Sequence, residues 1–222
     1  MSTYVLMRIL ESAPRRYEFG IRILTLGHVD KVYDRLAARI KPGQQVLDLG
    51  CGTGALTVRA ARQGAMVRGI DINARMLEIA RQRVKMAGLT ERVELLEMGV
   101  SQLDGEEANH YDAVMSGLCL SELSEDELTY TLKEATRVLR GGGVLLIADE
   151  IEPGGIVKRL IHTVLRVPLA VLAYAVAQQT TRPVSNLLEK LADAGLSIVS
   201  VRLDLLGSFG EIAAQKPAGK PS

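Results

Sequence analysis

The sequence predicts an α/β fold built on a mostly parallel sheet of seven strands that ends in an antiparallel hairpin. Three observations support this prediction. Continuously apolar segments alternate with amphipathic ones between residues 45 and 148, which is typical of strands covered by helices on both faces. A glycine-rich turn follows the first apolar segment. The last part of the chain alternates apolar and polar residues with a period of two, as strands do.

The composition is that of an ordinary globular chain. Of the 222 residues, 47% are hydrophobic and 24% are charged, which excludes a disordered tail or a collagen. The net charge of +1 and the aromatic content of 4% argue against nucleic acid as a partner. Cys51 and Cys119 are too few for a disulfide scaffold or a zinc site, so we expect no metal and a cytoplasmic location.

Residues 1–42 are predicted to form a helical N-terminal cap, because four apolar residues recur there at helical spacing before Pro42 and Gly43. These four residues are Val29, Val32, Leu36 and Ile40. The domain proper is expected over residues 43–216, with a helical insertion at about 152–182, and residues 217–222 are expected to form a flexible tail.

Strands and helices are expected to alternate through the central region. The strands are predicted at 45–49, 66–70, 93–98, 111–118 and 144–148, and the helices at 56–63, 73–87 and 124–139. Asn73 and Ser124 are suitable N-caps, and Glu127 stands at the capping-box position relative to Ser124. The glycines at 141–143 are expected to turn the chain into the fifth strand.

The C-terminal part is expected to add a helix and a hairpin. The helix is predicted over 183–195, with Ser185 as its N-cap. Apolar residues stand at every second position from Val199 to Leu205, as in a half-buried strand. Gly207 is expected to turn the chain into a second strand at 209–214.

The most informative segment is Val46–Gly54, in which a buried strand leads into a loop that contains Gly50 and Gly52. Glycines let the backbone approach a ligand, and the helix that follows offers free N–H groups. Ligands of open α/β sheets bind in this crevice, at the carboxyl ends of the strands. Gly50, Gly52 and Ala55 also fit the loose pattern of dinucleotide-binding loops, so the glycines alone do not choose the cofactor.

Two acidic residues favour one kind of cofactor. Asp48 precedes the loop beside the helix N-terminus, where a carboxylate suits an ammonium group and opposes a pyrophosphate. Asp71 ends the next strand, where a carboxylate can accept hydrogen bonds from the hydroxyls of a ribose. An amine-bearing nucleoside without phosphates fits both positions, and S-adenosylmethionine is such a molecule.

Four spaced motifs resemble the class I S-adenosylmethionine-dependent methyltransferases over roughly residues 40–150: VLDLGCGTG, GIDIN, YDAVMSGL and LRGGGVLLIADE. This resemblance implies a Rossmann-like fold with S-adenosyl-L-methionine as the cofactor. It also implies that Asp48 binds the amino group, that Gly50 and Gly52 pass under the methionine part, and that Asp71 holds the ribose with Ile72 against the adenine. The remaining predicted cofactor contacts are Tyr17, Cys51, Gly99, Val100, Ser101 and Ser116.

Two positions depart from the family pattern. Val100 stands where the family commonly has an acidic residue near the adenine amine, so we expect backbone groups or Ser101 to read the adenine. Gly141 stands where proline is usual, which is expected only to soften the turn.

Other parts of the chain resemble more particular groups within this family. Stretches within residues 16–27 and 187–207 are similar to the quinone-biosynthesis C-methyltransferases. The runs Leu6–Gly27, Ser116–Glu127 and Leu205–Glu211 are similar to the corrinoid protein-associated methyltransferases. These resemblances imply the fold and the cofactor but leave the methyl acceptor open.

Few catalytic side chains are expected, because a sulfonium methyl group is already activated and the protein must chiefly position the acceptor and exclude water. A general base is needed only when the acceptor loses a proton. The candidates are Glu122 after the fourth strand, Glu150 at the end of the fifth, and His28 in the N-terminal cap. A purely structural role, as a solvated or loop residue, is the alternative for Glu122 and Glu150.

The acceptor is expected to be a hydrophobic or amphipathic small molecule, because the basic and apolar segment 156–182 can line an apolar pocket. This segment can instead meet a corrinoid protein or the surface of a membrane, or simply pack on the domain. The chain would then methylate a protein-bound partner or sense S-adenosylmethionine for it. A nicotinamide-dependent oxidoreductase is a third interpretation, and it depends on Ala55 alone.

Overall fold

The computed structural model describes residues 28–152, 183–204, 207 and 209–219. Several predictions lie outside these residues. They concern Tyr17 with the rest of residues 1–27 of the cap, almost all of the insertion at 152–182, and residues 220–222 of the tail.

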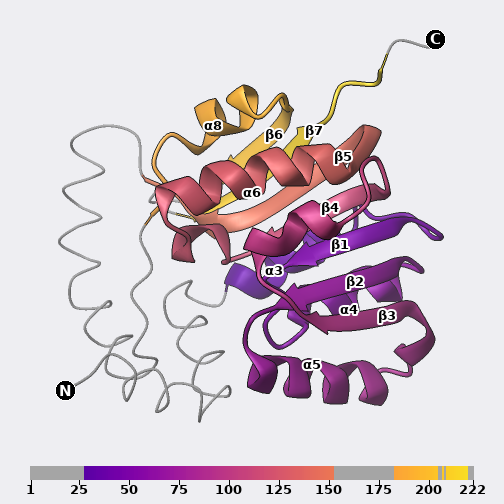
Figure 1. Cartoon of the computed structure of the whole chain (residues 1–222). Coiled ribbons are helices and arrows are strands. Elements are labelled where there is room, and N and C mark those ends of the chain that lie inside the picture. The colour runs from indigo at the N-terminus through magenta and orange to yellow at the C-terminus, as the bar shows by residue number, and fades with distance from the viewer. Residues whose placement is uncertain (1–27, 153–182, 205–206, 208, 220–222) are drawn as a thin grey trace, which may run out of the picture.

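The described residues contain one sheet of seven strands in the order β3-β2-β1-β4-β5-β7-β6 (Figure 1). Strands β1 to β5 pair in parallel, and β7 lies antiparallel between β5 and β6. The predicted α/β fold with its C-terminal antiparallel hairpin is therefore confirmed. The strands are β1 Gln45–Leu49, β2 Met66–Asp71, β3 Val93–Glu97, β4 Tyr111–Gly117, β5 Leu139–Glu150, β6 Ser197–Leu203 and β7 Phe209–Gln215.

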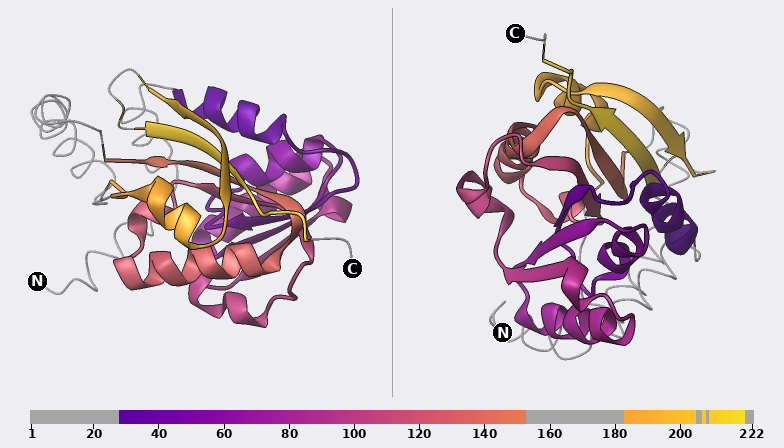
Figure 2. Two further views of the ribbon diagram at one scale, coloured as in Figure 1. Left: turned by 90° about the horizontal axis from the view of Figure 1, so that it is seen from above. Right: turned by 90° about the vertical axis from the view of Figure 1, so that its right-hand side faces the viewer.

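Helices cover both faces of the sheet (Figure 2). On one side α3 packs against α4 and β5, and α5 extends this side over β2 and β3. On the other side α6 and α8 pack together, over β5 and β6. The helices are α3 His28–Ala37, α4 Ala55–Arg62, α5 Ala74–Met86, α6 Glu125–Val138 and α8 Leu187–Asp193, and the short 3₁₀ helices are η1 Thr90–Arg92, η2 Val100–Gly105 and η3 Leu120–Glu122.

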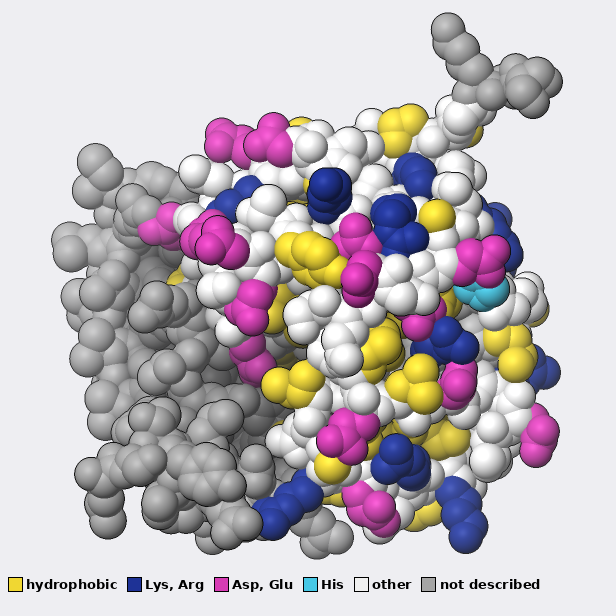
Figure 3. Space-filling model, in the orientation of Figure 1, with side chains coloured by type: hydrophobic (Ala, Val, Ile, Leu, Met, Phe, Trp, Pro, Cys, Tyr) yellow, Lys and Arg dark blue, Asp and Glu magenta, His cyan; other side chains and the backbone are white. Residues whose placement is uncertain are grey.

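Two hydrophobic clusters join the sheet to these helices, one on each face. Successive residues of β1 point to opposite faces, so Val46 packs with α3 and α4 whereas Leu47 packs with α6 and α8. This explains why the central strands are continuously apolar. On the outer surface around α6, acidic and basic side chains are interspersed (Figure 3).

The predicted helix starts at Asn73 and Ser124 are confirmed. The Asn73 side chain accepts hydrogen bonds from the N–H groups of Arg75 and Met76 at 3.1 and 3.2 Å. Ser124 and Glu127 form a reciprocal capping box at the start of α6. The predicted apolar face of α3 is confirmed as well, because its members are buried.

The prediction that Ser185 caps a helix is wrong. Helix α8 begins only at Leu187, after Asn186 with a φ of 50° and without a side-chain cap. The reason lies just before it, where Val184 donates a hydrogen bond to the carbonyl oxygen of Glu150 at 2.9 Å and bridges Ile151. The chain is thus held in extended form up to this point.

Strand β5 begins earlier than predicted. Leu139 already pairs with Tyr111, and the register then shifts before Val144 pairs with Ala113. The expected turn at 141–143 is therefore an irregularity within β5, where Gly142 has a φ of 83°.

Strand β6 is not half-buried as predicted. Val199, Val201 and Leu203 remain 54%, 40% and 49% exposed. The cause is the strand order, because β7 enters beside β5 and leaves β6 at the edge of the sheet. No helix within the described ranges has the length and apolar character needed to cross a membrane.

Candidate functional site

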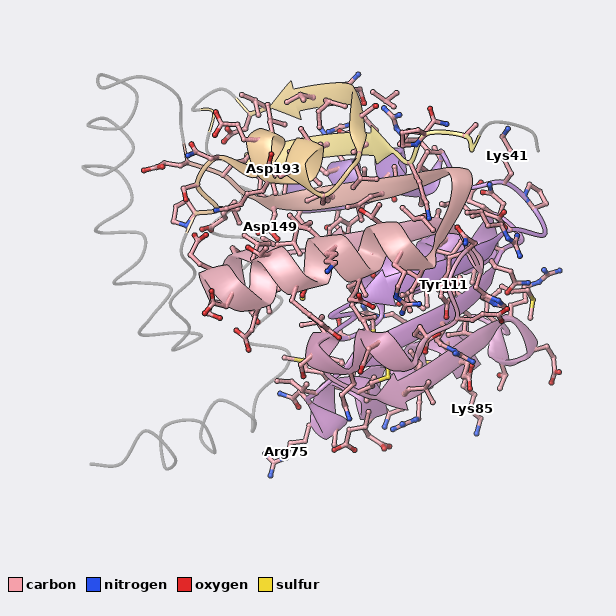
Figure 4. All side chains as sticks on the ribbon, turned by 45° about the horizontal axis from the view of Figure 1, so that its top comes forward. Lys41, Arg75, Lys85, Tyr111, Asp149 and Asp193 are labelled. Carbon is pink, nitrogen blue, oxygen red and sulfur yellow. The ribbon has the colours of Figure 1, made fainter. Side chains whose placement is uncertain are left out.

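The candidate site lies at the carboxyl edge of the parallel strands. Leu49, the last residue of β1, pairs with Ser116 of β4, so Gly50, which follows β1, and Gly117, which ends β4, lie side by side. Figure 4 shows Asp149 near this edge, whereas Tyr111 lies toward the opposite edge. The glycine loop and the ends of β4 and β5 therefore lie together at the edge of the sheet where the ligand crevice was predicted.

A cavity of about 410 Å³ opens at this place, between the glycine loop and helices α3 and α4. Its lining includes Tyr33, Asp48, Gly50, Gly52, Arg59 and Gly117. Among the predicted cofactor residues, Asp48, Gly50, Cys51 and Gly52 line this cavity.

The two glycines of the loop serve different purposes. Both have a positive φ, 61° at Gly50 and 52° at Gly52, which other residues rarely adopt. A Cβ atom on Gly50 would lie 2.5 Å from Sγ of Cys119, so a side chain there would collide with the wall of the crevice. A Cβ atom on Gly52 would meet nothing within 4 Å, so this glycine leaves bare backbone facing open space.

Asp48 is a fully buried acid with one unused oxygen. Its Oδ2 accepts a hydrogen bond from Oγ1 of Thr57 on α4 at 2.5 Å. Its Oδ1 has no hydrogen-bond partner among the described residues. The pKa of Asp48 is raised to about 7, because burial and the carboxylate of Asp71 together raise it more than the hydrogen bond from Thr57 lowers it. A cationic group placed at Oδ1 would satisfy this oxygen.

Asp71 is tied to the glycine loop. Its Oδ2 accepts from the N–H of Gly52 at 2.7 Å and its Oδ1 from the N–H of Asn73 at 2.8 Å. Each oxygen retains a second lone pair that can accept from a ligand hydroxyl. Burial raises the pKa of Asp71, and the two backbone hydrogen bonds act in the opposite direction.

The residues predicted to surround adenine lie next to Asp71. Ile72 is 76% exposed, and a Cβ atom on Gly99 would lie 3.1 Å from its Cγ2. Val100 begins η2 and Ser101 follows with an exposed side chain. An exposed apolar side chain beside bare backbone offers a surface on which a flat ring can lie.

Further acids stand on the other side of the crevice. Asp149 is buried and accepts from three backbone N–H groups, those of Leu120, Ser121 and Glu150. It therefore holds the segment after β4 against the end of β5. Burial raises its pKa to about 6, although these hydrogen bonds oppose the shift.

Glu122 keeps an exposed surface at the end of η3. Partial desolvation by neighbouring atoms, together with the negative charges of Asp149 and Asp71, raises the pKa of Glu122 to about 7. A carboxyl group with such a pKa exchanges protons readily near neutrality.

The other predicted residues are placed as follows. The Glu150 side chain is half-buried at the end of β5, and His28 begins α3. The Ser116 hydroxyl is buried without a hydrogen-bond partner among the described residues. Cys51 is buried, and a Cβ atom on Gly69 would lie 3.1 Å from its Sγ, so it packs against β2.

Sequence reasoning missed Tyr33 and Arg59, which line the cavity from α3 and α4. Tyr33 shares the buried helical face of Val29 and Leu36, and this spacing could have identified it. The guanidinium of Arg59 lies 5.8 Å from the centre of the Tyr33 ring.

The crevice as a whole carries negative charge. Asp48, Asp71, Asp149 and Glu122 form no ion pair with any described residue, since only neutral donors contact them. Such an arrangement favours a cationic ligand and opposes a phosphate.

The comparisons with known proteins agree with this geometry. Residues 46–143 match the family model described as Methyltransferase domain. This match supports the resemblance of the chain to the class I S-adenosylmethionine-dependent methyltransferases. The chain also resembles individual members of this class.

It is 36% identical over 135 residues to a demethylmenaquinone methyltransferase of Tropheryma whipplei, covering 60% of this chain and 53% of that protein. It is 27% identical over 153 residues to a ubiquinone/menaquinone biosynthesis C-methyltransferase of Vibrio cholerae, covering 66% of this chain and 57% of that protein. The chain thus spans about half the length of the curated relatives that it matches.

A solved structure shows the same fold. A geranyl diphosphate methyltransferase in complex with S-adenosylmethionine superposes with a TM-score of 0.65, at 17% identity, covering 89% of this chain and 90% of that one.

Proposed function

We propose that this chain transfers a methyl group from S-adenosyl-L-methionine to a small-molecule acceptor of hydrophobic or amphipathic character. The observation that supports the cofactor most strongly is the unused Oδ1 of the buried Asp48, a residue that lines a cavity beside bare loop backbone. An ammonium group would satisfy this oxygen, whereas the pyrophosphate of a nicotinamide dinucleotide would be repelled there.

Several of the predicted cofactor residues have a proposed part in holding this molecule. Asp48 binds the amino group, Gly50 and Gly52 pass under the amino-acid part, and Asp71 accepts from the ribose hydroxyls. The adenine lies on Ile72 beside the η2 segment. The exposed side chain of Ser101, which belongs to η2, can form a hydrogen bond with the edge of the adenine ring.

When bound, S-adenosylmethionine supplies a methyl group that is already activated toward nucleophiles. The chain's own contribution is to fix the direction of attack and to exclude water. For an acceptor that loses a proton, we propose Glu122 as the base, because its carboxyl has a pKa of about 7 and an exposed surface beside the crevice. Glu150 and His28 remain alternatives.

The relatives support a class of acceptor. The two curated relatives described above are named for methylation in quinone biosynthesis. We therefore propose a quinone-type acceptor as the first to test. A corrinoid protein or a membrane surface that meets residues 156–182 is the alternative, and that segment lies outside the described residues.

The cofactor is tested by isothermal titration of the purified chain with S-adenosylmethionine and, separately, with NAD. We expect saturable binding of S-adenosylmethionine and none of NAD. Binding of NAD alone would contradict the assignment.

The reaction is tested by incubating the chain with S-adenosylmethionine that carries a labelled methyl group. The acceptors are a panel of demethylated quinones, lipids and corrinoid-containing extracts. Label in a quinone is the expected result. Tight cofactor binding without label in any acceptor would instead favour a protein that senses S-adenosylmethionine.

A further inference from the structure

Tyr33 brings a phenol to the end of β4. The residue lies on α3 and is only 9% exposed. A Cβ atom on Gly117 would lie 2.5 Å from the Tyr33 hydroxyl oxygen and 2.8 Å from Cζ, so the ring occupies the space that a side chain at this position would fill. Glycine at the end of β4 is therefore a requirement for the position of the phenol.

This position is level with the glycine loop. Gly117 pairs with Ala148 of β5 and directly follows Ser116, which pairs with the last residue of β1. The hydroxyl thus lies where the chain leaves β1, and Tyr33 lines the same cavity as Asp48.

The hydroxyl has no hydrogen-bond partner among the described residues, although its ring is held firmly. Arg59 stacks over the ring, and its guanidinium is fixed by Asp34 at 2.7 Å and Asp30 at 2.8 Å. A phenol that lines the cavity without a partner among the described residues can donate this hydrogen bond to a ligand.

We propose that the Tyr33 hydroxyl donates a hydrogen bond to the α-carboxylate of the amino-acid part of S-adenosylmethionine. The inference rests on the proposed function. In an amino acid the ammonium and carboxylate groups share one carbon, so a donor for the carboxylate must lie close to the acid that binds the ammonium.

Two of the three arginines that line the cavity, Arg59 and Arg83, are already engaged. Arg59 bonds to two aspartates, and Arg83 donates to the hydroxyl of Thr53 at 3.1 Å. The phenol also stays protonated here, because burial and the negative charges of Asp48 and Asp149 raise its pKa. It is therefore a neutral donor that tolerates the neighbouring carboxylates.

The test compares two ligands on two variants. Decarboxylated S-adenosylmethionine keeps the ammonium and the sulfonium but lacks the carboxylate. Tyr33→Phe keeps the ring and its contact with Arg59, and should weaken the binding of S-adenosylmethionine about tenfold while leaving the decarboxylated ligand unchanged. Tyr130→Phe, which removes a phenol bonded to the N–H of Asp104 instead, should leave both affinities unchanged.

Equal weakening of both ligands by Tyr33→Phe, or no effect on either, would overturn the inference. Gly117→Ala displaces the same phenol from the side of β4 and should also weaken S-adenosylmethionine more than the decarboxylated ligand. Should the unaltered chain bind neither ligand, the proposed function itself would fall, and this inference with it.

Discussion

Charged side chains are paired differently at the two ends of the parallel strands, the amino edge and the carboxyl edge of the sheet. At the amino edge, Arg68 bonds to Glu94 at 2.8 Å and to Glu106 at 2.9 and 3.0 Å, and the Tyr111 hydroxyl donates to Glu106 as well. At the carboxyl edge, Asp48 accepts a hydrogen bond from a single hydroxyl group, and its other carboxylate oxygen has no partner among the described residues.

Other residues extend this contrast. At the amino edge Asp112 accepts from Arg140 at 2.7 Å and from the N–H of Gln45 at 2.8 Å. At the carboxyl edge Asp71 and Asp149 accept only from backbone N–H groups of the described residues. Charge at one edge is thus neutralised within the protein, whereas charge at the other is left for a ligand.

The largest expected effect is a loss of affinity for S-adenosylmethionine when an acid at the carboxyl edge is replaced. Asp71→Ala should weaken S-adenosylmethionine binding about 100-fold, because it removes two acceptors for the ribose hydroxyls and frees the N–H of Gly52. Isothermal titration measures the change.

Glu106→Gln is the matched control at the amino edge. It should lower the free energy of unfolding by weakening the contact with Arg68, and leave the affinity within about twofold. Equal affinities of Asp71→Ala and the unaltered chain would contradict the proposed ribose site.

The next effect concerns pH. In the folded chain the pKa of Asp48 is raised from 3.8 to about 7 and that of Asp149 from 3.8 to about 6. The folded state therefore binds more protons than the unfolded state between about pH 4 and 7. The free energy of unfolding of the ligand-free protein should fall as the pH rises through this window, with Asp48 contributing on the order of 2 kcal/mol.

Urea denaturation at several pH values measures this slope. Asp48→Asn should flatten it, since the amide does not titrate, and Glu106→Gln should retain it. A stability that rises between pH 4 and 7 and is unaffected by Asp48→Asn would contradict the contrast between the edges.

A smaller effect is expected for Tyr111→Phe at the amino edge. The substitution removes one hydrogen bond to the Glu106 carboxylate and should cost about 1 kcal/mol of stability. The affinity for S-adenosylmethionine should not change. Thermal unfolding and titration on the same sample test both statements, and a loss of affinity would show that this edge also serves the ligand.

The smallest effect is expected for Ser116→Ala. The hydroxyl is buried and has no partner among the described residues, so its removal should leave the stability unchanged or raise it by less than about 1 kcal/mol. A large loss of stability on thermal unfolding would reveal a hydrogen bond that the described residues do not show.

Much of the fold could be predicted from the sequence because its signals are local. The apolar strands, the Asn73 cap and the Ser124 capping box depend on residues close together in the chain. Strand order is not local, and this is why the exposure of β6 was missed: β7 inserts beside β5 and leaves β6 at the edge. The start of α8 was missed for the same reason, since Val184 is held by Glu150 from another element.

The site shows the same division. The motif around Gly50, together with Asp48 and Asp71, predicts a crevice that the structure assembles at one edge. Tyr33 was missed because its relation to Gly117 arises only when α3 packs over the end of β4.

The claim that the acids of the carboxyl edge are left for a cationic ligand is tested most directly by the number of protons exchanged when S-adenosylmethionine binds. S-adenosylmethionine is titrated calorimetrically at pH 6, where its free amino group is already protonated, in buffers of different ionisation enthalpy. A cation that pairs with Asp48 lowers the raised pKa of this carboxyl, so we predict the release of protons, and a smaller release from Asp48→Asn. Binding without proton release, or with net uptake, would contradict the account.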